Sequence, residues 1–262
     1  MTIRARGASP SRAGGATGGG VESVAAALDV FARARLEVVA PESAPGVAPA
    51  LGIVAAFCDE VAADLLDPVS RRRLQRSEGP AREILPPQIL IRLLGPCARL
   101  FPYQIVAGSG VIAAFLAEIP RLAAWLLRRG FVETGAADPF DAAWRRAGAD
   151  LRRHRQLQQT LERAAAARRP PVGDAEIVVG RFFVDKRDER GLWVTADAGQ
   201  RGPVHAPRPA LDMFAGGQEA SMAFERSLCG WSLLAACLPC TPGDIENWLS
   251  EEQAAATCGA SD

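Results

Sequence analysis

Apolar side chains recur through the first two thirds of the chain at the spacing of helices with one buried face. Val24, Leu28 and Phe31 follow one another at intervals of three or four, and the segment from Leu51 to Leu65 repeats the pattern after a connection rich in proline and glycine. The most apolar segments are PPQILIRLLGPCARLF at 86–101 and VIAAFLAEIPRLAAWLLRRGF at 111–131. These segments predict the core of an N-terminal helical bundle.

A further helix is predicted to begin at Asp138, where an N-cap acid precedes Pro139, a residue whose missing N–H is not needed at the first helical position. This helix can extend to Arg169, because Pro170 and Pro171 then stop it. Its apolar stripe is sparse, so we expect one side to pack and the other to face solvent.

The pattern changes after residue 170. Residues 176–184 and 191–196 are rich in β-branched and aromatic residues and are separated by the six charges DKRDER, which predicts a β-hairpin over 176–196 with a charged loop. Apolar residues at helical spacing then predict a helix over 218–238, and a second short helix is expected over 242–250.

Together these elements predict an α+β fold that is predominantly α: an N-terminal helical bundle followed by a small β-hairpin plus helices. We expect a helical domain over 21–169 and a small α+β region over 170–250. A disordered tail over 1–20 and a flexible tail over 251–262 complete the expected organisation.

Composition narrows the function classes. The chain has 262 residues, of which 48% are hydrophobic and 23% charged, so it belongs with globular proteins. Thirty basic residues balance thirty acidic ones, and no field of the whole protein steers it to nucleic acid or to a membrane. Lys186 is the only lysine, an arginine bias that a high-GC genome explains.

Two features bear on the cellular compartment. The first 20 residues lack the apolar segment of a secretory signal, so we expect a cytoplasmic protein with reduced thiols. The uncharged stretch over 100–117 approaches the length of a bilayer span, but Pro102 and Gly108 interrupt it. A buried turn between two core helices is therefore favoured over a membrane segment.

Cysteine provides the one cluster of ligand-like residue types: Cys229, Cys237 and Cys240, with Cys258 downstream. Thiolates two residues apart can chelate zinc or an iron–sulfur cluster, and a redox CxxC pair is a further reading. The neighbours of Cys229 and Cys237 are apolar and belong to the helix predicted over 218–238, where cysteine behaves as a small buried hydrophobe. Structural thiols are the favoured interpretation.

Histidine and glycine patterns give little support for catalysis. His154 lies among arginines and is expected on the solvated surface, and His205 lies in a loop between prolines. Neither histidine pairs with an obvious nucleophile, and the Gly108-Ser109-Gly110 stretch lacks the remainder of a P-loop. We predict no catalytic residue and no cofactor.

The favoured function is that of a non-catalytic adaptor, assembly or accessory protein whose partner is another protein or a peptide segment. The residues expected to bind that partner are Arg181, Phe182, Phe183 and Trp193, since aromatic and arginine side chains anchor interfaces.

An arginine-mediated nucleic-acid binder or regulator is the alternative. Its binding residues would be Arg145, Arg146, Arg152, Arg153 and Arg155. A second alternative is an enzyme or metal protein that uses the C-terminal cysteines.

Overall fold

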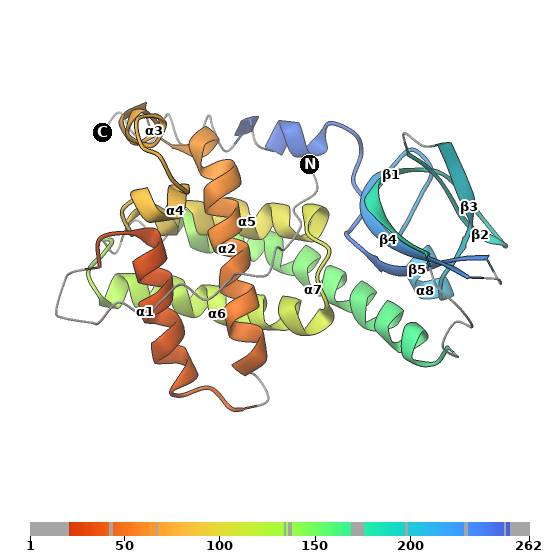
Figure 1. The fold of residues 1–262 in the computed structure, drawn as a ribbon, viewed down its shortest axis with the longest axis horizontal. Coiled ribbons are helices and arrows are strands. Elements are labelled where there is room, and N and C mark those ends of the chain that lie inside the picture. The colour runs from red at the N-terminus through yellow and green to blue at the C-terminus, as the bar shows by residue number, and fades with distance from the viewer. Residues whose placement is uncertain are drawn as a thin grey trace.

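The protein is described here from a computed structural model, which covers residues 21–41, 44–66, 68–133, 135, 138–168, 176–196, 199–227, 230–248 and 250–251. The predicted fold class is confirmed: a helical N-terminal region precedes a small domain of five strands with short helices (Figure 1). The tails predicted over 1–20 and from 252 onward lie outside the described residues.

The N-terminal region is a bundle in which α2 packs on α6 and α5 packs on α7 (Figure 1). Its helices are α1 (Val24–Leu36), α2 (Ala44–Leu65), α3 (Pro68–Gln75), α4 (Ala81–Ile84), α5 (Ile89–Gln104), α6 (Ser109–Arg128) and α7 (Asp138–Ala166). The two segments with the strongest apolar pattern became α5 and α6, whose inner faces are the centre of the core.

The uncharged stretch over 100–117 covers the end of α5, a turn at 105–108 and the start of α6, as predicted. Among the described helices, α6 is the one that is long and apolar enough to cross a membrane by length and composition. Its residues Ile112, Phe115 and Ile119 are fully buried in the bundle core.

A close approach between α5 and α7 depends on a small residue. A Cβ atom added to Gly95 would lie 2.9 Å from the Cβ of Ala143, a distance that real side chains do not adopt. Gly95 therefore lets the backbones of these two helices pack more closely than any other residue would.

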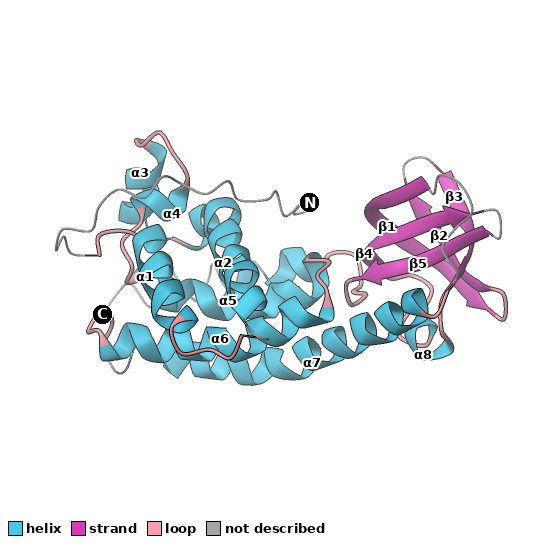
Figure 2. Cartoon of the chain, turned by 60° about the horizontal axis from the view of Figure 1, so that its bottom comes forward, coloured by secondary structure: helices cyan, strands magenta, loops and turns pink. Residues whose placement is uncertain are grey.

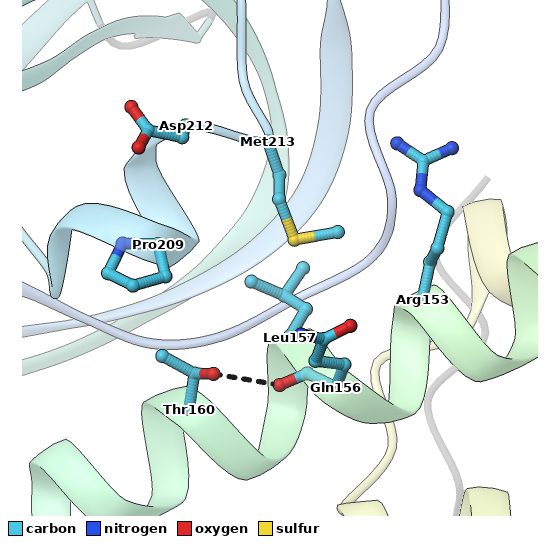
Figure 3. A pocket seen from close by; sticks show the side chains of 7 residues that line it. All are labelled: Arg153, Gln156, Leu157, Thr160, Pro209, Asp212 and Met213. Atoms are coloured by element: carbon cyan, nitrogen blue, oxygen red, sulfur yellow. Dashed lines mark hydrogen bonds between the residues drawn. The ribbon is translucent and has the colours of Figure 1, made fainter.

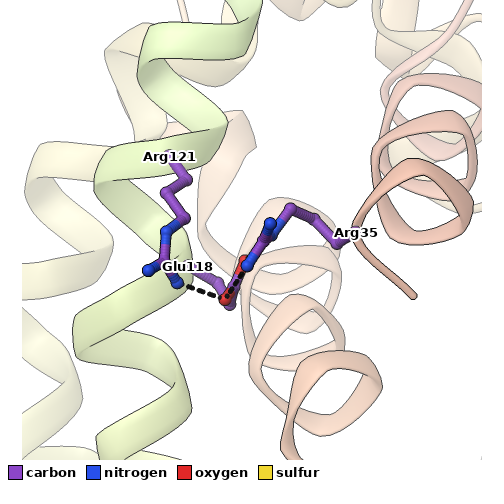
Figure 4. Close-up of polar contacts among 3 residues, drawn as sticks. All are labelled: Arg35, Glu118 and Arg121. Atoms are coloured by element: carbon purple, nitrogen blue, oxygen red, sulfur yellow. Dashed lines mark hydrogen bonds and ion pairs between the residues drawn. The ribbon is translucent and has the colours of Figure 1, made fainter. Parts of the chain in front are cut away.

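One charged cluster is built into the bundle (Figure 4). Glu118 of α6 is almost fully buried and accepts hydrogen bonds from Arg35 of α1, with Nε at 2.6 Å and Nη2 at 3.1 Å, and from Arg121 at 2.7 Å. Burial alone would raise the pKa of Glu118, but the hydrogen bonds and charges of Arg35 and Arg121 lower it overall. The cluster ties α1 to α6.

The C-terminal domain is a closed barrel with the strand order β1-β2-β3-β5-β4. Strands β3 and β5 are parallel, whereas the other neighbouring strands are antiparallel. Along the chain, α8 follows β3 and precedes β4. Its elements are β1 (Glu176–Asp188), β2 (Gly191–Ala196), β3 (Gly199–His205), α8 (Arg208–Leu211), β4 (Glu219–Ser227) and β5 (Gly230–Ala236). This strand order, with a helix after the third strand, is the topology of an OB-fold barrel.

The helix predicted over 218–238 is wrong, because this segment forms β4 and β5. The apolar residues lie three or four apart, which is the spacing expected of a helix. In the structure Met222 and Phe224 alternate with less buried residues and point into the barrel. A register shift between Ala223 and Phe224 disturbs the strict alternation that would have indicated a strand. Pairing with β1 and burial in the barrel then decide the outcome.

The predicted hairpin consists of β1 and β2, but its loop is shorter than the six charges indicated. β1 continues to Asp188, and only Glu189 and Arg190 form the turn. Gly191 follows with φ at +142°, and a Cβ atom there would lie 2.4 Å from the carbonyl oxygen of Val204. Glycine at this position is what allows β2 to begin directly against β3.

Helix α7 joins the two parts of the molecule, with one end in the bundle and the other against the barrel (Figure 2). Leu157 and Leu161 belong to the barrel core, and the side-chain amide of Gln158 donates a hydrogen bond to the carbonyl of Ala236 at the end of β5. α7 therefore contributes buried side chains to the core of the bundle and to the core of the barrel.

His154 lies on the buried side of α7 and is fully buried, so its predicted surface position is wrong. Its ring packs against Phe101, with the ring centroids 5.7 Å apart, and burial lowers its pKa to about 4. The arginines beside it in the sequence point to the opposite side of the helix, which is why sequence neighbours misrepresented its surroundings.

Candidate nucleic-acid interface

The outer face of α7 carries a cluster of arginines that we term the arginine ridge. It consists of Arg145, Arg146, Arg152, Arg153 and Arg155, all of which are exposed. Their positions follow from the helical period: Ala143, Ala147, Leu151, His154 and Leu157 turn inward, so the arginines between them turn outward. Arg145 and Arg152 are seven residues apart and lie along one line, about 10 Å from each other.

The ridge is locally unbalanced in charge. Between residues 142 and 161, five arginines stand against the single carboxylate of Asp150, which gives a net charge of +4 although the whole chain is neutral. Arg153 lies 3.6 Å from Asp150, and Asp150 also accepts a hydrogen bond from Tyr103 at 2.8 Å. This one acid is therefore shared with the neighbouring helix α5.

The other four arginines of the ridge have no acidic partner among the described residues. Elsewhere in the protein some exposed arginines have one: Arg121 pairs with Glu118 at 2.7 Å, and Arg187 pairs with Asp212 at 3.0 Å. Four unpaired guanidinium groups on one helix repel one another and attract anions. The planar donor fork of each group fits a phosphate.

A pocket of about 290 Å³ adjoins the ridge where α7 meets α8 (Figure 3). Its lining comes from Arg153, Gln156, Leu157 and Thr160 of α7 and from Pro209, Asp212 and Met213 of the barrel. Met213 points toward Leu157, while Arg153 stands at the other side of the pocket (Figure 3). Arg153 thus belongs both to the ridge and to the pocket.

The residues predicted to bind a protein partner separate in the structure. Phe182 points into the barrel core and packs against Phe224 with ring centroids 4.6 Å apart, so its predicted interface role is wrong. Phe183 is on the outer surface and is 41% exposed, and Arg181 is paired with Glu219. Successive side chains of a β-strand point to opposite faces, so Phe182 points into the barrel and its neighbour Phe183 points outward.

Trp193 lies on the outside of β2 and is partly buried. Its Nε1 donates a hydrogen bond to Asp188 at 2.9 Å, and the ammonium group of Lys186 lies 4.9 Å from its ring centroid. The indole N–H of Trp193 and one face of its ring therefore already have partners within the hairpin.

An apolar stripe on β1 was not predicted as such. Ile177, Val179 and Phe183 are 62%, 49% and 41% exposed, and together they form half of the exposed large hydrophobic residues among the described ones. The signal available in the sequence was the period of two, which places 177, 179 and 183 on the same face of the strand. This alternation is hard to recognise in the sequence, because the residues on the inner face of β1 are equally apolar.

The cysteines do not form a metal site within the described residues. Cys237 and Cys240 are buried, and Cys229 and Cys258 lie outside the described residues. No group of three His, Cys, Asp or Glu side chains in that part of the chain is placed to hold a metal ion. Burial raises the pKa of Cys240 to about 11, so this thiol is neutral at physiological pH.

The second histidine, His205, is exposed at the end of β3, not in a free loop. In the part of the chain that the structure covers, no hydrogen bond joins either histidine to a carboxylate or to a thiol. The described residues thus bring together an anion-binding surface and a pocket, not an acid–base pair with a nucleophile.

Comparison of the chain with protein-family models, with curated proteins and with solved structures gives no match.

Proposed function

We propose that the protein binds single-stranded nucleic acid through the arginine ridge of α7, with the adjoining barrel as part of the same surface. The observation that carries this proposal is the set of exposed arginines at 145, 146, 152 and 155 that have no acidic partner among the described residues. Guanidinium groups in such an arrangement are stabilised by phosphates.

The barrel supports a single strand over a duplex. OB-fold barrels commonly bind oligonucleotides, and they do so as single strands that lie across the barrel surface. This support is an analogy of fold, because one fold serves many functions. The ridge itself is a feature of this chain, and it adjoins the barrel at α8, where Arg153 lines the pocket. The part of the barrel that α7 contacts is β5 and α8, whereas OB-fold barrels bind oligonucleotides on the face of strands 2 and 3.

The experiment is a salt titration of binding to fluorescein-labelled DNA and RNA strands of about 15 nucleotides, within the range that such barrels cover. If the five arginines each contact one phosphate, the slope of log K against log salt is about −3.5, because each contact in a single strand contributes about 0.7. Affinity should then fall about 100-fold between about 50 and 200 mM salt. A duplex of the same sequence should bind less tightly, and absence of binding at the lower salt concentration contradicts the proposal.

A protein-binding function is the second candidate, and the apolar stripe of Ile177, Val179 and Phe183 favours it. Three side chains form only a small part of a stable interface, which commonly buries about 800 Å² on each partner. A partner on this stripe should be retained at high salt and lost when Phe183 and Val179 are changed to serine. Changes in the ridge should leave that partner bound.

A further inference from the structure

The pocket between α7 and α8 has a composition that suits a flat heterocycle. Pro209 and Met213 supply apolar surface above the buried Leu157, and the thioether of Met213 makes favourable contacts with aromatic rings. Gln156 supplies both a donor and an acceptor in its side-chain amide. The hydroxyl of Thr160 donates to the carbonyl of Gln156 at 2.9 Å, which leaves its oxygen lone pairs as acceptors.

The size of the pocket sets an upper limit on the occupant. Its volume of about 290 Å³ is at the low end of the range for sites that hold drug-sized molecules. A single base with part of its sugar suits that volume, whereas two stacked nucleotides would exceed it.

The position of the pocket specifies where the base would come from. Arg153 is the fourth of the five ridge arginines along α7 and also lines the pocket, and Gln156 and Thr160 follow it one and two turns later (Figure 3). A strand whose phosphates lie on the ridge therefore has a backbone position directly beside the opening. Guanidinium groups also stack on bases, so Arg153 can contact the phosphate or the base.

We infer that the pocket between α7 and α8 receives one unstacked base of a strand whose phosphates lie on the arginine ridge. This inference rests on the proposed function and adds a base-binding subsite to it. The subsite accounts for a preference for single strands, because a base in a duplex must first be unpaired and unstacked before it enters a pocket, a cost that a single strand largely avoids.

The test compares two DNA probes of equal length, about 15 nucleotides, and equal charge. One is oligothymidylate, and the other has the same phosphates but abasic residues throughout. We expect the protein to bind the thymidine probe at least about fivefold more tightly, since a single base contact is worth a factor of this order or more.

Two independent variants then localise the effect. Thr160→Met fills the pocket, and Gln156→Met removes the amide donor and acceptor at nearly constant size. Neither changes the charge, and both place a good helix former in α7. Each should reduce the preference for the thymidine probe to less than about twofold, while Gln159→Met, the same replacement at a position of α7 that does not line the pocket, should keep it. Circular dichroism spectra identical to that of the parent establish that the variants fold.

The outcomes separate the two proposals. If the parent binds neither probe at low salt, the proposed function and the subsite are both wrong. If the parent binds both probes equally, or if Thr160→Met and Gln156→Met both keep the preference, the ridge binds phosphate but the pocket holds no base, and only the present inference is overturned.

Discussion

Glu118 offers the sharpest test of how the helical bundle is held together. Changing Glu118 to Gln keeps the shape of the side chain but removes the charge that Arg35 and Arg121 contact. The Glu118 side chain is 3% exposed and that of Arg35 is 18% exposed, so Arg35 would be left with little access to water. Loss of one partner of a buried ion pair costs about 3 to 5 kcal/mol.

The loss of stability from removing the Glu118 charge should be smaller than for a fully buried ion pair. The side chain of Arg121 is 52% exposed and can return to solvent, and the partial exposure of Arg35 allows some rehydration. We therefore expect Glu118→Gln to lower the free energy of unfolding by about 2 to 3 kcal/mol at neutral pH. Arg121→Ala is the matched control and should cost no more than about 1 kcal/mol, because it removes only the exposed partner.

The assay is urea denaturation followed by far-ultraviolet circular dichroism, which reports on the helices. Because the folded-state pKa of Glu118 is lowered, the contribution of the ionised carboxylate is complete above its ordinary pKa of 4.5 and is lost as the pH falls through the lower folded value. The gap between the parent and Glu118→Gln should therefore shrink in acid. A variant within about 0.5 kcal/mol of the parent at neutral pH would refute the reasoning, since changes of that size are typical of unimportant surface sites.

Two further predictions concern α7 and its neighbours. Burial lowers the pKa of His154 from 6.5 to about 4, so the parent should lose about 3 kcal/mol of stability between those pH values as the unfolded chain takes up the proton. His154→Leu should remove this part of the pH dependence in urea titrations, and an unchanged pH profile would show that the ring is not held neutral. Gly95→Ala should cost about 1 to 3 kcal/mol because its new Cβ would lie 2.9 Å from that of Ala143. Adding Ala143→Gly should restore most of the loss in thermal unfolding, and simple additivity of the two changes would contradict the proposed close approach.

The helical half of the fold was predictable because its signal is local. In α5 and α6 a single apolar face repeats over many turns, so periodicity alone defines the element. The barrel was not predictable in the same way. β4 pairs with β1 and β5, and the burial of Phe224 depends on both partners, neither of which is visible in the sequence of β4 alone.

The candidate site shows the same division. The ridge arginines were identified from their density in the sequence, and the helical period correctly implied a solvated side for α7. The burial of His154 was missed because it depends on the contact with Phe101, about fifty residues earlier in the chain. The pocket was missed for a similar reason, since Thr160 and Met213 meet only when α8 of the barrel packs against α7.

The central claim is that the unpaired ridge arginines bind phosphates. Its most direct test is the salt dependence of single-strand binding in the triple variant Arg145→Ala, Arg146→Ala and Arg152→Ala. The control is a triple variant that removes exposed arginines of the bundle away from the ridge, namely Arg33→Ala, Arg92→Ala and Arg128→Ala. Both variants lose three positive charges and differ only in where those charges were.

We predict that the slope of log K against log salt becomes shallower by about 2 in the ridge variant, about 0.7 for each lost contact, and stays within about 0.5 of the parent in the control. Equal changes of slope in both variants would show that binding follows net charge alone. That result would contradict a phosphate-binding surface on α7.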